Sequence, residues 1–231
     1  MIAWGITVAA LIVLWLVTAR RYGPQTAVGF VLLTSCLVPT WCRIEVGDLP
    51  LDARMVAVIF SLAAYCLHRK ATFPWRLGLI DACMLLLLAV HAFSDTLNTG
   101  WQWTIPLRIY GEWCVAYFAG RLAMHQESSI RQMVVVGAVA GAILNIGGII
   151  EALTEFHPWE AVYGERFFDG ISRTSRRWGI LRAWGPCGHP IYFSVLQLLF
   201  VPWTIVACRR LVRQGYHVGW LLPLLMITRA Y

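Results

Sequence analysis

Long apolar stretches recur along this chain at short intervals, and they limit what it can fold into more than any other feature. An α-helix needs roughly 20 consecutive apolar residues to cross the ~30 Å hydrocarbon core of a bilayer. Seven stretches approach that length, at about 1–19, 25–41, 52–67, 77–94, 101–123, 132–153 and 188–208. Only 13% of the 231 residues are charged and 59% are hydrophobic, whereas soluble domains carry about 25% charged residues. The sequence therefore predicts an all-α polytopic membrane protein.

An eighth apolar stretch runs from 218 to 231, where the sequence stops. It is too short to cross the hydrocarbon core by itself. We therefore expect seven or eight transmembrane helices in a single transmembrane domain over 1–231. We also expect the chain to be truncated within a helix and to be the N-terminal part of a longer protein.

Basic residues alternate between the two sides of the predicted spans. Ten of the 19 Lys and Arg residues lie on one side: Arg20, Arg21, Arg69, Lys70, Arg76, Arg121, Arg131, Arg209, Arg210 and Arg213. On the other side, the connection at 94–100 has none, and the first connection has only Arg43 and Arg54. Cytoplasmic loops are the ones enriched in Lys and Arg. The N-terminus is therefore predicted to be periplasmic.

This topology accounts for most of the net charge of +7, so the charge does not indicate nucleic acid as a partner. The chain has no CxxC, HExxH, GxGxxG or P-loop pattern, so no motif supports metal or nucleotide chemistry. Cys42 and Cys187 are both predicted outside and could pair, but sequence does not give their separation.

The predicted outside loop at 154–187 departs from the charge rule, because it carries Arg166, Arg173, Arg176, Arg177 and Arg182. Longer loops cross the membrane whatever their charge, so these side chains could simply form a solvated surface. Arginine is also the side chain best suited to bidentate contacts with phosphate. In that interpretation Arg182 binds an anion, with supporting contacts from Arg166 and Arg177. Both interpretations stay open at this point.

The segment "RAWGPCGHPIYF" at 182–193 leads from that loop into the last complete span. Pro190 suits the first turn of a helix, where its missing N–H costs nothing. Gly185 and Gly188 allow a tight turn and a close approach of the backbone. A helix that starts near Pro190 would direct its N-terminal N–H groups toward Arg182, which favours an anion there. For His189 alone we favour a helix cap over a ligand contact.

Two opposite charges lie within the fifth predicted span, in "IPLRIYGEW". Arg108 and Glu112 are four residues apart and would share one face of a helix. They could neutralise each other, or Arg108 could reach the same outward cavity as Arg182, because charges within membranes usually face a cavity or one another. Asp81 and His91, near the two ends of the fourth span, are predicted to be helix-end residues.

Several of these segments together resemble the O-antigen ligase and O-antigen polymerase family. The "RWGILRAWGPCGHPIYF" segment resembles the R-x-x-G…P signature at the outer start of a middle span, in the branch associated with exopolysaccharide synthesis. "GLIDACMLLLL", "IPLRIYGEW…YFAGR" and "GERFFDG" add to the resemblance, which covers the chain as the N-terminal part of a family member.

The resemblance implies a GT-C-like architecture in the bacterial inner membrane and a metal-independent glycosyltransferase without a cofactor. Such an enzyme moves a glycan from undecaprenyl diphosphate to an acceptor glycan or to lipid A–core on the periplasmic side. It further implies that Arg182 holds the diphosphate, with Gly185 and Pro190 as structural companions and Arg108 as a second contact. The general base is implied to lie beyond residue 231, in a later periplasmic loop.

Two other classes of function remain open on the sequence. A transporter or flippase for a polysaccharide or lipid carrier would also place charges within spans, and the glycines of "GAVAGAILNIGG" could mark a broken helix. We interpret those glycines as small residues for close helix packing. The second class is a non-catalytic partner of an export complex.

Overall fold

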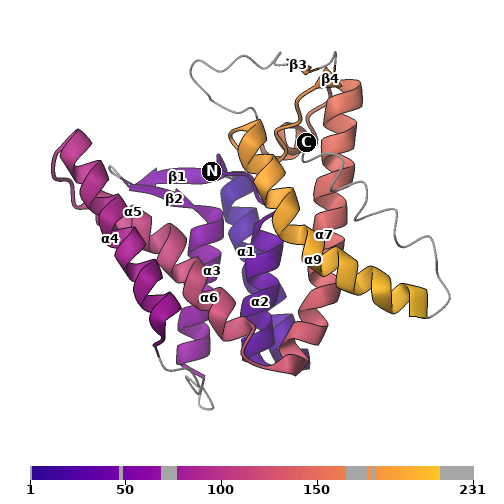
Figure 1. The fold of residues 1–231 in the computed structure, drawn as a ribbon, viewed down its shortest axis with the longest axis horizontal. Helices are drawn as coiled ribbons and strands as arrows, with labels where there is room; N and C mark the ends of the chain where they lie inside the picture. The colour runs from indigo at the N-terminus through magenta and orange to yellow at the C-terminus, as the bar shows by residue number, and fades with distance from the viewer. Residues whose placement is uncertain (1, 47–48, 69–76, 165–175, 178–179, 214–231) are drawn as a thin grey trace. The chain divides into compact units, whose positions relative to one another are not determined.

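The computed structural model describes residues 2–46, 49–68, 77–164, 176–177 and 180–213. It is mostly helical (Figure 1). The elements in chain order are α1 (Ile2–Tyr22), α2 (Pro24–Ser35), β1 (Arg43–Val46), β2 (Leu49–Asp52), α3 (Ala53–Cys66), α4 (Leu79–Thr99), α5 (Thr104–Ile109), the π-helical turn η1 (Tyr110–Cys114), α6 (Val115–Ala123), α7 (Glu127–Thr154), α8 (Pro158–Tyr163), β3 (Arg176–Arg177), β4 (Ile180–Leu181) and α9 (Pro190–Arg213).

These elements form two compact units. The first comprises residues 1–35 and 43–130, and the second comprises 36–42 and 131–231. Each unit is described by itself below.

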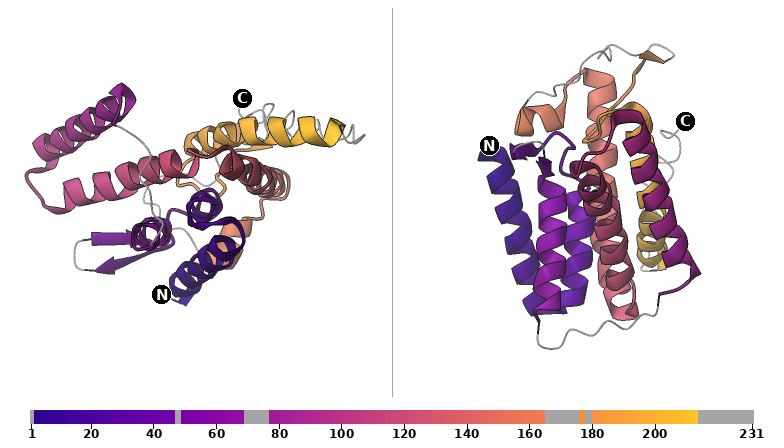
Figure 2. Two further views of the ribbon diagram at one scale, coloured as in Figure 1. Left: turned by 90° about the horizontal axis from the view of Figure 1, so that it is seen from below. Right: turned by 90° about the vertical axis from the view of Figure 1, so that its left-hand side faces the viewer.

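In the first unit, α1, α2, α3 and α6 pack against one another (Figure 2). Ala27, Val28 and Val31 of α2 are almost fully buried. The polar residues of α2 are buried as well, and they have partners: the Gln25 amide donates to the carbonyl oxygen of Leu122 at 2.6 Å, and the hydroxyl of Thr26 lies 2.9 Å from that of Ser129. These bonds offset the cost of burying amide and hydroxyl groups.

Two short connections orient the helices of this unit. Gly23 has a φ of +93° and is followed by Pro24, which begins α2. A left-handed glycine ends one helix and a proline starts the next, as both residue types favour. Before α3, β1 and β2 form an antiparallel hairpin with Arg43 opposite Asp52. Asp52 then caps α3 by accepting a hydrogen bond from the backbone N–H of Arg54 at 2.8 Å.

In the second unit, glycines of α7 allow close packing. A Cβ atom on Gly137 would lie 2.8 Å from the Trp203 ring, and one on Gly147 would lie 2.3 Å from the Trp159 ring. Both separations are too short for a side chain at these positions. The prediction that the α7 glycines serve helix packing is confirmed at these two positions.

Among the described residues, four helices are long and apolar enough to cross a membrane: α1, α4, α7 and α9, with 21, 21, 28 and 24 residues. They match the predicted spans at 1–19, 77–94, 132–153 and 188–208. The fifth predicted span, 101–123, is helical from Thr104 to Ala123 but contains η1. The predicted spans at 25–41 and 52–67 contain helices of only 12 and 14 residues, shorter than a crossing requires. The stretch at 218–231 lies outside the described residues.

Candidate functional site

The turn before α9 has the local structure expected from its sequence. Pro190 is the first residue of α9. The backbone N–H of Ile191 donates to His189 Nδ1 at 3.1 Å, and that of Phe193 donates to the His189 carbonyl at 3.1 Å. His189 therefore satisfies N–H groups that the first turn of a helix leaves without partners. The prediction that His189 caps this helix is confirmed.

Gly185, within the same turn, has a φ of +54°. The Phe193 ring lies where a Cβ atom would stand, with the nearest ring carbon 2.3 Å from that position. Both the conformation and the space thus require glycine. The turn also meets residues 36–42, because the backbone N–H of Thr40 donates to the Pro186 carbonyl at 3.0 Å. Cys187, in the turn, and Cys42 are both buried and are present as thiols.

A buried carboxylate holds this turn against α7. Glu151 has no exposed surface, and its Oε2 atom accepts a hydrogen bond from the backbone N–H of Gly185 at 2.9 Å. Its Oε1 atom lies 2.8 Å from Nδ1 of His157, the residue just before α8. Sequence analysis missed Glu151 because it ends an apolar run. The signal was a carboxylate within a predicted span, which is costly unless it has partners.

Arg182 stands between β4 and this turn and is partly buried. Within the described part of the chain, its guanidinium has no hydrogen bond or ion pair. A guanidinium always carries its charge and presents donors in a fork that matches phosphate or carboxylate. Arg182 can therefore contribute an un-neutralised positive charge to an anionic ligand.

The structure describes the side chain of one other arginine of this loop, Arg176. Arg176 in β3 pairs with Glu155. Arg177 also lies in β3, but its side chain is outside the described residues, and the whole of Arg166 is outside them. The supporting contacts expected from Arg166 and Arg177 therefore stay predictions.

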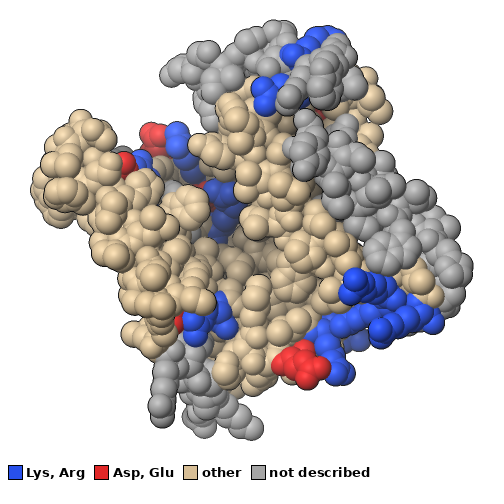
Figure 3. Space-filling model, viewed as in Figure 1, with Lys and Arg blue, Asp and Glu red and all other residues tan. Residues whose placement is uncertain are grey.

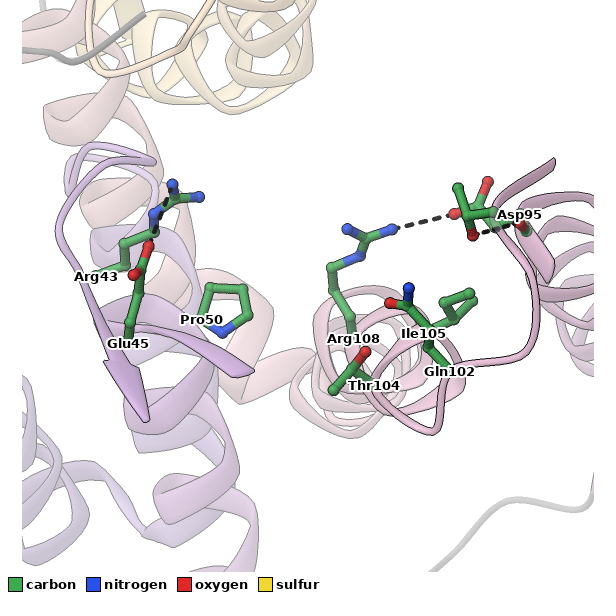
Figure 4. A pocket seen from close by; sticks show the side chains of 9 residues that line it. Arg43, Glu45, Pro50, Asp95, Gln102, Thr104, Ile105 and Arg108 are labelled. Carbon is green, nitrogen blue, oxygen red and sulfur yellow. Dashed lines mark hydrogen bonds and ion pairs between the residues drawn. The ribbon is translucent and has the colours of Figure 1, made fainter. Parts of the chain in front are cut away.

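Arg108 belongs to the first unit, where it pairs with Asp95 at 3.1 Å. It lines a pocket of about 480 Å³, and Arg43 and Glu45 of the β1–β2 hairpin line the same pocket (Figure 4). The Glu112 side chain is outside the described residues, so its predicted pairing with Arg108 is untested. Arg108 and Arg182 lie in different units, and their predicted joint contact with one diphosphate is likewise untested.

A second buried carboxylate lies at the start of α4. Asp81 is fully buried and accepts hydrogen bonds from Arg121 at 2.5 Å, from the Tyr117 hydroxyl at 2.8 Å and from the Gly78 backbone N–H at 2.7 Å. The expected helix-end position of Asp81 is confirmed by the Gly78 contact. Its partners on α6 were not predicted.

The surface has the character of a membrane protein. Large apolar side chains are exposed on all four long helices, including Val13 of α1, Leu86 of α4, Val139 of α7 and Leu199 of α9. On the face drawn in Figure 3, the charged side chains of the described residues gather in a few groups with wide uncharged areas between them. Exposed apolar patches of this extent mark a surface that another apolar phase covers. The protein is therefore membrane-embedded.

No protein-family model, curated protein or solved structure matches this chain.

Proposed function

We propose that this protein is a membrane glycosyltransferase that moves a glycan from undecaprenyl diphosphate to an acceptor sugar, as O-antigen ligases and polymerases do. The observation that carries the proposal is Arg182, a partly buried cation with no ion pair among the described residues, next to a turn fixed by a buried carboxylate. The proposal includes a GT-C-like arrangement of seven or eight spans in the inner membrane, with a periplasmic N-terminus.

The charge distribution within the second unit supports a periplasmic location for Arg182. Arg209, Arg210 and Arg213 lie at the C-terminal end of α9, and Arg210 donates to the carbonyl oxygen of Arg131 near the start of α7 at 3.1 Å. The 24 residues of α9 correspond to ~36 Å at 1.5 Å per residue, which is enough to cross the hydrocarbon core. Basic residues mark the cytoplasmic side. This distribution supports our proposal that the turn at 182–189 faces the opposite, periplasmic side.

The chemistry of a lipid diphosphate fits an arginine in this setting. The leaving diphosphate gains negative charge as the glycosidic bond breaks, and a pre-placed cation lowers that barrier without a metal. A site at the membrane interface also has a lower effective dielectric than water, which strengthens each charge contact. In this proposal Arg182 binds the leaving group, and Gly185 and Pro190 set the path of the chain around it. Arg108 is proposed as a second diphosphate contact.

The direct test uses the full-length protein in liposomes with an undecaprenyl diphosphate-linked glycan and a soluble acceptor oligosaccharide. We expect the labelled glycan to appear covalently on the acceptor. Movement of the intact lipid-linked glycan between leaflets without a new glycosidic bond would instead identify a flippase. If a functional preparation shows neither transfer nor movement between leaflets, the remaining interpretation is a non-catalytic role in an export complex.

A further inference from the structure

His157 and Glu151 form a side-chain pair that the proposed diphosphate site does not use. The chain reverses direction just after α7, where Glu155 takes the left-handed conformation with a φ of +59°. A left-handed backbone is uncommon for residues other than glycine. This turn brings His157 back toward α7, so that its Nδ1 atom lies 2.8 Å from Glu151 Oε1.

The pair has the geometry by which a carboxylate orients a histidine. Glu151 is fully buried, whereas the His157 side chain is 22% exposed. A carboxylate that accepts the Nδ1 proton fixes the tautomer in which Nε2 carries a lone pair. In the described part of the chain, Nε2 has no hydrogen-bond partner. The imidazole thus has one anchored nitrogen and one nitrogen able to accept a proton.

The same carboxylate also fixes the turn that carries the arginine. Glu151 Oε2 accepts from Gly185 N–H at 2.9 Å, three residues after Arg182 in the chain. One buried side chain thus connects a candidate proton acceptor to the segment proposed to bind the leaving group. Acceptor activation and leaving-group binding are the two tasks that glycosyl transfer from a diphosphate requires.

We propose that His157 is the general base that activates the acceptor, with Glu151 as its positioning residue. This inference rests on the proposed function. Nε2 takes the proton of the acceptor hydroxyl as that oxygen bonds to the anomeric carbon of the donor glycan. The bond from the anomeric carbon to the diphosphate oxygen breaks, and its electron pair leaves with the diphosphate. The proton stays on His157, where Glu151 stabilises the imidazolium until solvent removes the proton.

This assignment differs from the one implied by the family resemblance, which puts the base in a later loop. It also differs from a purely structural role, in which the pair only joins α8 to α7. A structural role depends on the shape and hydrogen bond of His157. A base additionally depends on a proton-accepting nitrogen, and a small base from solution can replace that nitrogen when the side chain is removed.

The test compares His157→Ala with the matched variant His189→Ala in the full-length protein, using transfer from undecaprenyl diphosphate-linked glycan to a soluble acceptor. A general base contributes typically 10²–10⁴-fold. We expect His157→Ala to lose at least about a hundredfold in turnover and to regain much of it with added imidazole. His189→Ala, which removes a helix cap and the ring contacts of His189 with Trp184 and Tyr192, should gain nothing from imidazole. Glu151 is fully buried, so a substitution there could prevent folding. The test therefore relies on the variants His157→Ala and His189→Ala.

The outcomes separate the two proposals. A wild-type protein that forms no new glycosidic bond would overturn the proposed function, and this inference with it. A wild-type protein that transfers glycan, together with a fully active His157→Ala variant, would overturn only the inference. A loss in His157→Ala that imidazole does not restore would also overturn it, because it would show a structural role.

Discussion

The carboxylate of Asp81 on α4 and the guanidinium of Arg121 on α6 are joined at 2.5 Å, although the residues are 40 positions apart. Asp81 is fully buried, and the Arg121 side chain is 31% exposed. A carboxylate within a membrane span is costly unless it is paired and hydrogen-bonded. The pair thus attaches the start of α4 to α6 within the first unit.

We expect the removal of one charge of the Asp81–Arg121 pair to destabilise the protein more than the removal of both charges. Arg121→Met leaves an uncompensated buried carboxylate, whereas Arg121→Met with Asp81→Leu removes the whole charge pair. The yield of monodisperse protein and its thermal midpoint in detergent should be lowest for the single variant. Tyr117→Phe, which removes one hydrogen bond to Asp81, serves as a mild control. Losses that simply add in the double variant would contradict this account.

The pair formed by Arg108 and Asp95 is predicted to be much weaker. The two side chains are 47% and 29% exposed, and solvent screens exposed ion pairs to at most about 1 kcal/mol. A double-mutant cycle with Arg108→Gln and Asp95→Asn should give a coupling energy in that range. The same cycle with Glu112→Gln tests the pairing predicted from sequence. A large coupling to Glu112 and none to Asp95 would contradict the structure.

Gly185→Ala should destabilise the turn before α9 by more than the strain of a left-handed backbone alone. Alanine at this position would be strained by the φ of +54°, and its methyl group would also clash with the Phe193 ring. Overpacking of this kind typically costs about 1–3 kcal/mol. Gly164→Ala is the matched control, because Gly164 has a φ of +86° with open space around its Cβ position. Thermal unfolding should show the larger loss for Gly185→Ala, and equal losses would show that backbone strain alone matters.

Features that depend on local chemistry could be predicted from the sequence. The start of α9 at Pro190 and the cap at His189 follow from residues within one turn of each other. The long apolar runs that became α1, α4, α7 and α9 carry their signal in composition alone. In each case the deciding interactions lie within the segment itself.

Features that depend on distant partners could not be predicted. Nothing near Glu151 indicates that its carboxylate meets Gly185, 34 residues further on. Likewise, no local pattern in the sequence indicates that Asp81 pairs with Arg121, 40 residues further on. The span predicted at 25–41 ran through Pro39, whereas α2 ends at Ser35. A proline removes a backbone donor and disfavours helix in the residue before it, which fits a helix that ends before Pro39.

The predicted orientation can be tested with reporter fusions after residues 70, 98, 126, 165 and 212. The asymmetry of Lys and Arg predicts cytoplasmic positions for 70, 126 and 212 and periplasmic positions for 98 and 165. Alkaline phosphatase should be active only at the latter two. Phosphatase activity at position 126 would reverse the orientation of α7 and with it the side on which Arg182 lies.

The central claim is that the position of Arg182, and not the general positive charge of its loop, binds the leaving diphosphate. Arg176 provides the matched control, since it lies in the same loop but is paired with Glu155. The loss of one charge-assisted contact to the leaving group should cost on the order of 3 kcal/mol, or about a hundredfold in rate. Lysine should not restore the rate, because a point charge cannot reproduce the guanidinium fork.

The most direct measurement is therefore the rate of glycan transfer from purified undecaprenyl diphosphate donor by the full-length protein and its Arg182→Ala, Arg182→Lys and Arg176→Ala variants, each inserted normally. The account predicts losses of about a hundredfold for both Arg182 variants and a mild effect for Arg176→Ala. A fully active Arg182→Ala protein, or equal losses at Arg182 and Arg176, would contradict it.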